Sequence, residues 1–154
     1  SCLVGSEMCI RDSDYPFYLL LSERESKDTN DSSLISYFTY DHLTYLFMGD
    51  ASKQIEKQLM ATYDLKADVI KVGHHGSNTS SDPDFLDSLD CKIALISCGY
   101  KNKYGHPSVE TLKTLENLHI NTLCTSDYGS IAMYSLFHFS FVVTNDGMFG
   151  IIWT

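Results

Sequence analysis

Two adjacent histidines stand between glycines in the segment Gly73-His74-His75-Gly76, directly after an apolar stretch at residues 69–72. Neutral imidazole is the commonest metal ligand in proteins, and glycine lets the backbone approach a small charged group closely. Because the side chains of adjacent residues diverge, we expect one histidine to ligate a metal ion and the other either to face a substrate or to support the metal ligands from outside. A polar loop with two surface histidines is the alternative.

A carboxylate occupies a comparable place earlier in the chain. Asp50 follows the apolar residues 44–48 and Gly49, and it directly precedes a segment with helical spacing. Since α/β layers place their ligands at the carboxyl ends of the strands, Asp50 can point into a crevice there. An ordinary turn at a helix start is the alternative.

The third segment with chemical potential is Asn102-Lys103-Tyr104-Gly105-His106-Pro107, which again follows a predicted strand and precedes a predicted helix. His106 can act as an acid or as a substrate ligand, and the other polar side chains can donate hydrogen bonds to a phosphate oxygen. A turn with Pro107 at the helix start explains the segment equally well.

The elements that must position these residues follow from periodicity and turn signals. Strands are predicted at residues 17–21, 34–40, 44–48, 68–72, 92–97, 121–125, 130–134, 137–143 and 148–153, and helices at 52–62, 83–89 and 108–118. We expect Ser52 and Asp82 to cap the first two helices. The third should bury a face made of Val109, Leu112, Leu115 and Leu118. Turns are expected at residues 41–42 and 145–147, and the alternation of strands and helices favours an α/β layered fold.

Composition limits the classes of function. A chain of 154 residues that is 44% hydrophobic can bury the core of one domain, and its net charge of −9 excludes a generic polyanion binder. Any contact with nucleic acid must therefore be local.

The five cysteines lack C-x-x-C spacing, which favours buried or incidental thiols. No apolar run reaches the ~20 residues of a membrane span. We interpret His42, His119 and His138 as structural.

The first residues of the chain differ from the remainder. Residues 1–13 contain two cysteines and mixed charges without periodicity, and they resemble translated library-adaptor sequence. We assign them no element and interpret them as a non-native leader, so that residues 14–154 carry the domain. The gene is then expected to continue upstream.

Several of these motifs, in this order, resemble the C-terminal hydrolase domain of the ComEC DNA-internalisation family, within the metallo-β-lactamase superfamily. The similarity covers about residues 30–131 and is carried by Asn30-Asp31-Ser32-Ser33-Leu34, Leu46-Phe47-Met48-Gly49-Asp50, the run from Leu65 to Ser77, Ile96-Ser97, Asn102-Lys103-Tyr104-Gly105-His106-Pro107-Ser108 and Thr125-Ser126-Asp127-Tyr128-Gly129-Ser130-Ile131. The resemblance implies an αββα sandwich of the metallo-β-lactamase type, of which this chain is the C-terminal portion.

By the same resemblance, Asp50 bridges two divalent metal ions, zinc or manganese, and His75 ligates the second ion. His74 would lie beside the substrate, although the residues alone leave open which histidine ligates. His106 would protonate a leaving group or hold a phosphate, and Ser77, Asn102 and Tyr104 would be substrate-binding donors. Such a site suits hydrolysis of DNA or of a small phosphoester.

The chain also departs from the superfamily pattern, because the early His-x-His-x-Asp-His cluster does not occur in it. We therefore expect an incomplete metal site, an N-terminally truncated chain with little or no activity, and a parent that is an active hydrolase. Loss of the first half should also expose core and leave the strand at residues 34–40 with an unpaired edge.

Three functions remain open at this point. The leading hypothesis is the nuclease-like phosphodiesterase domain of a competence DNA-uptake protein, fused to a membrane channel and placed on the outer face of the bacterial cytoplasmic membrane. The second is a stand-alone hydrolase of a small phosphoester or ester, cytoplasmic or secreted. The third is a non-catalytic structural or interaction remnant, motivated by the missing cluster and the acidic charge.

Overall fold

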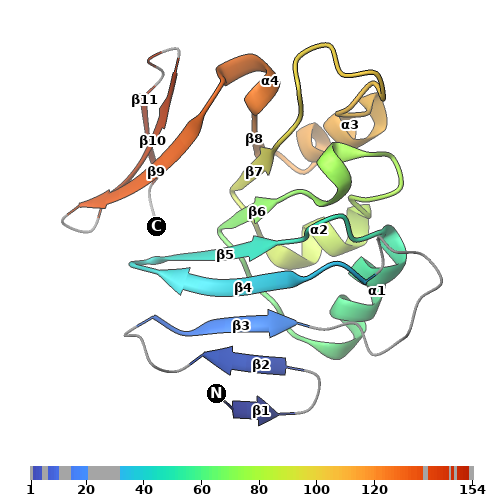
Figure 1. Cartoon of the computed structure of the whole chain (residues 1–154), viewed down its shortest axis with the longest axis vertical. Helices are drawn as coiled ribbons and strands as arrows, with labels where there is room; N and C mark the ends of the chain where they lie inside the picture. The colour runs from blue at the N-terminus through green and yellow to red at the C-terminus, as the bar shows by residue number, and fades with distance from the viewer. Residues whose placement is uncertain are drawn as a thin grey trace.

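A computed structural model describes residues 2–4, 7–10, 15–20, 32–136, 139–145, 147 and 149–152. They form a mixed α/β fold with two sheets (Figure 1). The large sheet has eight strands in chain order: β1 (Cys2–Val4), β2 (Glu7–Ile10), β3 (Phe17–Leu20), β4 (Ile35–Tyr40), β5 (Leu43–Phe47), β6 (Val69–Lys71), β7 (Ile93–Ile96) and β8 (Asn121–Cys124). The small sheet contains β9 (Ile131–Leu136), β10 (Phe139–Thr144) and β11 (Phe149–Ile152).

The direction of the strands changes at β5. Strands β1 to β5 pair antiparallel, whereas β5 to β8 pair parallel. Each parallel connection contains a helix: α1 (Lys53–Thr62), α2 (Pro83–Leu89) and α3 (Val109–Asn117), with the short α4 (Thr125–Tyr128) after β8. Parallel strands need such crossovers, and the crossovers bring the carboxyl ends of β5, β6 and β7 to one edge.

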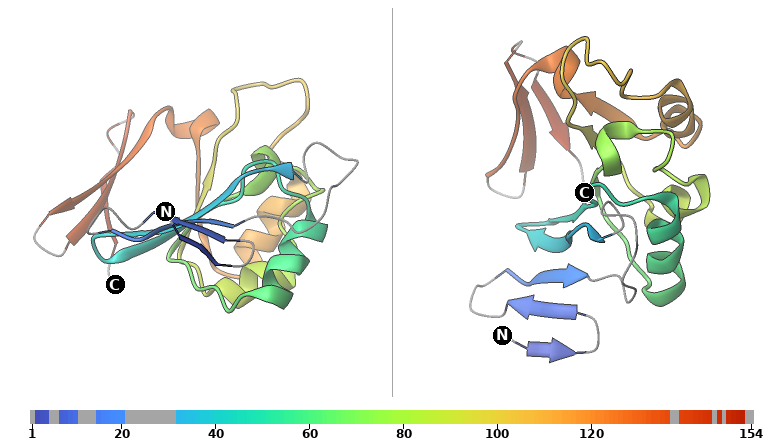
Figure 2. Two further views of the ribbon diagram at one scale, coloured as in Figure 1. Left: turned by 60° about the horizontal axis from the view of Figure 1, so that its bottom comes forward. Right: turned by 45° about the vertical axis from the view of Figure 1, so that its right-hand side comes forward.

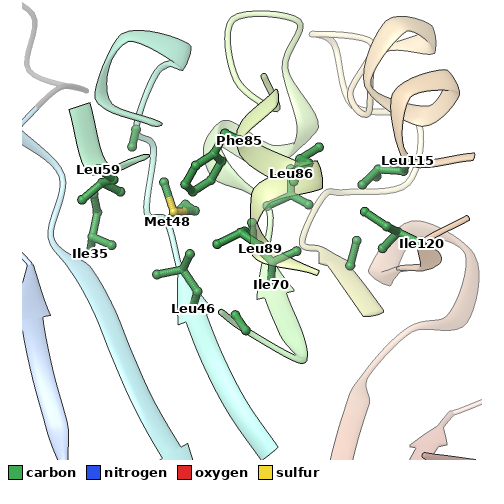
Figure 3. Packing of buried hydrophobic residues seen from close by; sticks show 14 of the residues in the cluster. Ile35, Leu46, Met48, Leu59, Ile70, Phe85, Leu86, Leu89, Leu115 and Ile120 are labelled. Carbon is green, nitrogen blue, oxygen red and sulfur yellow. The ribbon is translucent and has the colours of Figure 1, made fainter. Parts of the chain in front are cut away.

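Helices α1, α2 and α3 cover one face of the large sheet, and the small sheet packs against the opposite face (Figure 2). Alternate residues of the parallel strands divide between the two cores. Leu46, Ile70 and Ala94 belong to the helix-side core, whereas Tyr45, Val69 and Ile93 pack with residues of β10 and β11. Phe85, Leu86 and Leu89 point from α2 toward the strands (Figure 3).

Most predicted elements are confirmed with ends shifted by a residue or two. Asp82 caps α2, since its carboxylate accepts from the Asp84 N–H at 3.2 Å. Ser52 occupies the N-cap position of α1, as predicted, but its side chain makes no capping hydrogen bond. The last predicted strand, 148–153, appears as β11, paired with β10. His138, residues 22–31 and Trp153 lie outside the described residues.

One further expectation is wrong, and another is confirmed only in part. The strand predicted at residues 34–40 has no free edge, because β4 pairs with β3 on one side and β5 on the other. The predicted face of α3 is confirmed at Leu115, which is buried, and at Leu118, which packs against the core, but it is wrong at Val109 and Leu112, which are exposed. Thr111 is buried on this helix instead. Thr111 takes the inner position because its hydroxyl donates to the Ser77 carbonyl oxygen at 3.1 Å.

The first residues hold β1 and β2, to which no element was assigned from the sequence. The non-native origin of residues 1–13 stays a prediction, and so does the complete αββα sandwich. Among the described residues, no helix combines the length and the apolar character that crossing a bilayer requires.

Glu56 is a buried carboxyl group that joins two helices. It lies on α1 and is 1% exposed, and its two carboxylate oxygens accept hydrogen bonds from the Ser81 N–H at 2.8 Å and the Asp82 N–H at 2.6 Å. These two residues directly precede α2. Glu56 therefore fixes the end of the loop that begins with His74 and His75.

Candidate functional site

Asp50, His74, His75 and His106 gather at the carboxyl edge of the parallel strands. Asp50 follows β5, the two histidines follow β6, and His106 lies in the connection from β7 to α3. This is the edge where α/β sheets bind ligands. The prediction that these residues follow strand ends is confirmed.

Asp50 and His75 form the closest pair of potential ligands. His75 Nε2 lies 3.8 Å from Asp50 Oδ1, and the side chains are 49% and 45% exposed, so both are accessible to a ligand. His75 Nδ1 lies 2.6 Å from the Ser97 carbonyl oxygen. Because a carbonyl oxygen only accepts, Nδ1 is the donor in this hydrogen bond, and in the neutral ring the lone pair is then on Nε2, the nitrogen nearer Asp50. A metal-ligating histidine is usually oriented in this way.

His74 and His106 lie next to each other in the same site, and the His106 ring also contacts Tyr104. The His74 and His106 ring centroids are 5.9 Å apart, and His106 stacks on Tyr104 at 5.9 Å with an angle of 17° between the planes. His74 Nδ1 also lies 3.2 Å from Thr79 Oγ1. Burial lowers the pKa of His106, and the neighbouring His74 and His75 lower it further.

Asn102 and Ser77 are engaged within the protein. The Asn102 amide donates to the carbonyl oxygens of Gly99 and His106 at 2.9 and 2.6 Å, and its oxygen accepts from the His106 N–H at 2.9 Å. Ser77 is 4% exposed, and its hydroxyl lies 3.0 Å from Thr79 Oγ1. Both residues hold loops of the site in place. Their roles as substrate donors, like that of the exposed Tyr104, stay predictions.

Lys71 is a site residue that the sequence reasoning missed. Its ammonium group lies 3.4 Å from the Gly49 carbonyl oxygen, which also accepts from the His74 N–H at 3.1 Å. Burial lowers the pKa of Lys71, and the Asp50 carboxylate raises it in part. The sequence feature that could have identified Lys71 is a charged side chain at the end of the otherwise apolar strand β6. Gly49 thereby links the Asp50 turn to the histidine turn.

The backbone of both histidines is strained. His74 has φ 46° and ψ 44°, and His75 has φ 54° and ψ 24°, a left-handed conformation that non-glycine residues adopt rarely. Such residues cost on the order of 1–3 kcal/mol each and persist where the surroundings determine them. Here the Gly49 carbonyl and the Ser97 carbonyl hold the two histidines.

Gly76 provides a test of how tightly this turn is packed. It has φ +78°, and a Cβ atom there would lie 2.8 Å from Pro107 Cβ and 3.3 Å from Ile96 Cγ2. Gly76→Ala should therefore lower the free energy of unfolding by about 2–4 kcal/mol, through strain and overlap together. Urea denaturation measures the change.

Gly105→Ala is the matched control, because Gly105 has φ +70° and nothing lies within 4 Å of its added Cβ. Only the backbone cost of about 1 kcal/mol should remain there. Equal destabilisation by the two substitutions would show that Gly76 is not packed against Pro107.

The donor types at Asp50 and His75 suit a divalent metal ion, but the described residues contain no group of three or more histidine, cysteine, aspartate or glutamate side chains able to hold one. Catalytic zinc sites use about three protein ligands. Within the described part of the chain, this pair alone does not make up a catalytic metal site.

Comparison with known proteins gives matches over most of the chain. No protein-family model matches. The chain is 36% identical over 120 residues to ComE operon protein 3 of Bacillus subtilis, covering 77% of this chain and 16% of that protein. It is 32% identical over 121 residues to competence protein ComA of Neisseria gonorrhoeae, covering 77% of this chain and 17% of that protein. Recombination protein 2 of Haemophilus influenzae is 37% identical over 70 residues, covering 46% of this chain and 9% of that protein.

The chain spans less than a fifth of the length of these curated relatives. The alignment with the Bacillus subtilis protein extends over 120 residues, and so it is longer than the short segments that contain the histidines. This chain is a homologue of one segment of the competence proteins.

Proposed function

We propose that this chain is part of a metal-dependent hydrolase domain of the metallo-β-lactamase type, which cleaves phosphodiester bonds in a competence DNA-uptake protein. The observation that carries the proposal is the Asp50–His75 pair, whose atoms lie 3.8 Å apart at the strand edge, with His75 oriented by the Ser97 carbonyl. The homology to competence proteins supports DNA as the substrate class.

Asp50 and His75 would hold part of a site for two zinc or manganese ions, and the remaining ligands would come from residues outside this sequence. Bound ions of this kind supply Lewis acidity for hydrolysis of a phosphoester. His74 and His106 face each other beside the pair, so that one can hold a phosphate oxygen and the other can donate a proton to a leaving group. Tyr104 stacks on His106 and extends the site outward.

We propose further that the domain belongs to a larger protein with a membrane channel and lies on the outer face of the cytoplasmic membrane. The low share of each relative that the chain covers supports a larger parent. The 154 residues alone should bind metal weakly and show little activity, because two ligands do not complete a catalytic site.

The test uses the hydrolase domain with the sequence upstream of residue 14 recovered from source DNA. The purified domain should cleave single-stranded DNA and a chromogenic phosphodiester when zinc or manganese is added. Asp50→Ala and His75→Ala should each lower kcat by about a hundredfold or more, since each removes a metal ligand. Calorimetry should show weaker zinc binding in both variants.

His42→Ala serves as the control, because His42 lies in the β4–β5 turn, away from this edge. It should leave kcat and zinc affinity unchanged. Absence of metal-dependent cleavage in the extended domain, or full activity in Asp50→Ala, would refute the hydrolase proposal.

A further inference from the structure

The connection from β7 to α3 differs in charge from the rest of the chain. No aspartate or glutamate occurs from residue 91 to residue 109, whereas the whole chain has a net charge of −9. Within this stretch, Tyr100-Lys101 and Lys103-Tyr104 place two tyrosines and two lysines around Asn102. A local positive segment of this kind is where an acidic protein can contact a polyanion.

Both tyrosines of this loop are unusually exposed. Tyr100 is 75% exposed and Tyr104 is 70% exposed, although large aromatic side chains normally bury most of their surface. Lys101 Nζ lies 5.2 Å from the centroid of the Tyr100 ring, and Lys103 Nζ lies 4.9 Å from that of Tyr104. Each accessible ring therefore has a cation beside it.

The loop leads directly into the proposed hydrolytic site. Tyr104 stacks on His106, and His106 faces His74, with 5.9 Å between ring centroids at each step. The three hydrogen bonds of Asn102 hold the turn between the tyrosines and His106 in shape. A ligand that lies on the tyrosines thus extends toward the Asp50–His75 pair.

We propose that the loop at residues 99–106 binds single-stranded nucleic acid without sequence preference, with bases stacked on Tyr100 and Tyr104 and phosphates contacted by Lys101 and Lys103. Every base offers a π face, so stacking is tolerant of sequence, whereas a duplex keeps those faces covered. The inference rests on the proposed function in that it assigns the substrate of the same site. It adds Tyr100 and Lys101, which neither the histidine motifs nor the metal chemistry involve.

A protein partner is the competing occupant, since tyrosine is enriched in protein interfaces. Two observations favour nucleic acid. Lysine is depleted in such interfaces, yet here one accompanies each ring, and the loop adjoins residues suited to phosphoester chemistry.

The test is fluorescence anisotropy of the full 154-residue chain with a labelled oligothymidylate of about 20 nucleotides, against a blunt duplex of equal length. The single strand should bind more tightly than the duplex. Tyr100→Ala and Tyr104→Ala should each weaken binding by about fivefold to tenfold, and Tyr100→Phe and Tyr104→Phe should retain it, because phenylalanine keeps the ring. Tyr134→Ala is the matched control, at a tyrosine 59% exposed on β9.

Salt dependence separates the lysines from the rings. For single strands the logarithm of affinity falls with the logarithm of salt by about 0.7 per phosphate contacted, so Lys101→Gln with Lys103→Gln should reduce the slope by about 1.4. The tyrosine variants should leave the slope unchanged. Lys113→Gln, at an exposed lysine on α3, should alter neither slope nor affinity.

The outcome is distinguishable from that of the hydrolase test, because binding of the oligonucleotide is measured without added metal, whereas cleavage requires zinc or manganese. Binding that persists when cleavage fails would support the loop and refute only the hydrolase. The loop proposal is overturned if the single strand does not bind at low salt, if the duplex binds equally well, or if Tyr100→Ala and Tyr104→Ala bind like the control.

Discussion

Glu56→Ala is expected to lower the free energy of unfolding by about 2–6 kcal/mol, because it leaves the buried N–H groups of Ser81 and Asp82 without acceptors at about 1–3 kcal/mol each. Both donors lie at the start of α2, so the loop from His74 to Asp82 should loosen first. Urea denaturation gives the overall loss, and hydrogen exchange at Ser81 and Asp82 locates it. Unchanged stability would mean that water replaces the carboxylate there.

The same residue makes stability depend on pH. Burial raises the pKa of Glu56 from 4.5 to about 7. The hydrogen bonds from the Asp82 and Ser81 N–H groups lower this pKa, but by less than burial raises it. The folded state therefore binds the proton more tightly than the unfolded state does, so this stabilisation is complete below pH 4.5 and is lost as pH rises through about 7. The loss amounts to about 3 kcal/mol.

Glu56→Gln is the matched variant, because glutamine has a similar shape and does not titrate. The wild-type chain should be most stable relative to Glu56→Gln near pH 4.5. This difference in the free energy of unfolding should shrink by about 3 kcal/mol once the pH is above about 7. An advantage that grows with pH would show that the two N–H donors outweigh burial and keep Glu56 ionised.

Phe85→Ala is expected to lower the free energy of unfolding by about 3–5 kcal/mol, because Phe85 is 1% exposed and fills the space between α2 and the large sheet (Figure 3). The helix-side core includes residues from α1, α2 and α3 and from strands β3 to β8, so few neighbours can move into the cavity. Thermal and urea denaturation measure the loss.

Met60→Ala on α1 provides the comparison, since Met60 is 39% exposed and should cost less than about 1 kcal/mol. A loss at Phe85 no greater than that at Met60 would mean that α2 does not pack on the sheet as described.

The sequence predicted the parts of the fold that depend on local patterns. Short apolar runs that end at glycine identified β5 and β6, and Asp82 before Pro83 marked the start of α2. Once three successive strands are parallel, their ends share one edge, which is why the gathering of Asp50, His75 and His106 was predictable.

The remainder depends on partners that are distant in sequence. Glu56 lies among charged residues and looks like part of a solvated helix face, yet its partners are 25 and 26 residues away. The same holds for Thr111, whose acceptor Ser77 is 34 residues away. Periodicity assigns faces from residue type alone, so it could not identify a buried polar side chain whose hydrogen bond forms only in the folded chain.

The hydrogen bond from His75 to the Ser97 carbonyl has a consequence for the order in which the protein folds. The hydrogen bond spans 22 residues, the contact with Asp50 spans the β5–β6 crossover, and the packing of Gly76 on Pro107 spans the β6–β7 and β7–α3 connections. Long-range parallel pairing is a slow step in folding. A nascent chain therefore brings Asp50, His75 and Pro107 together only after β5, β6 and β7 have all docked. A chain interrupted before the loop at residues 99–106 would contain His74 and His75 without Pro107, against which their turn packs.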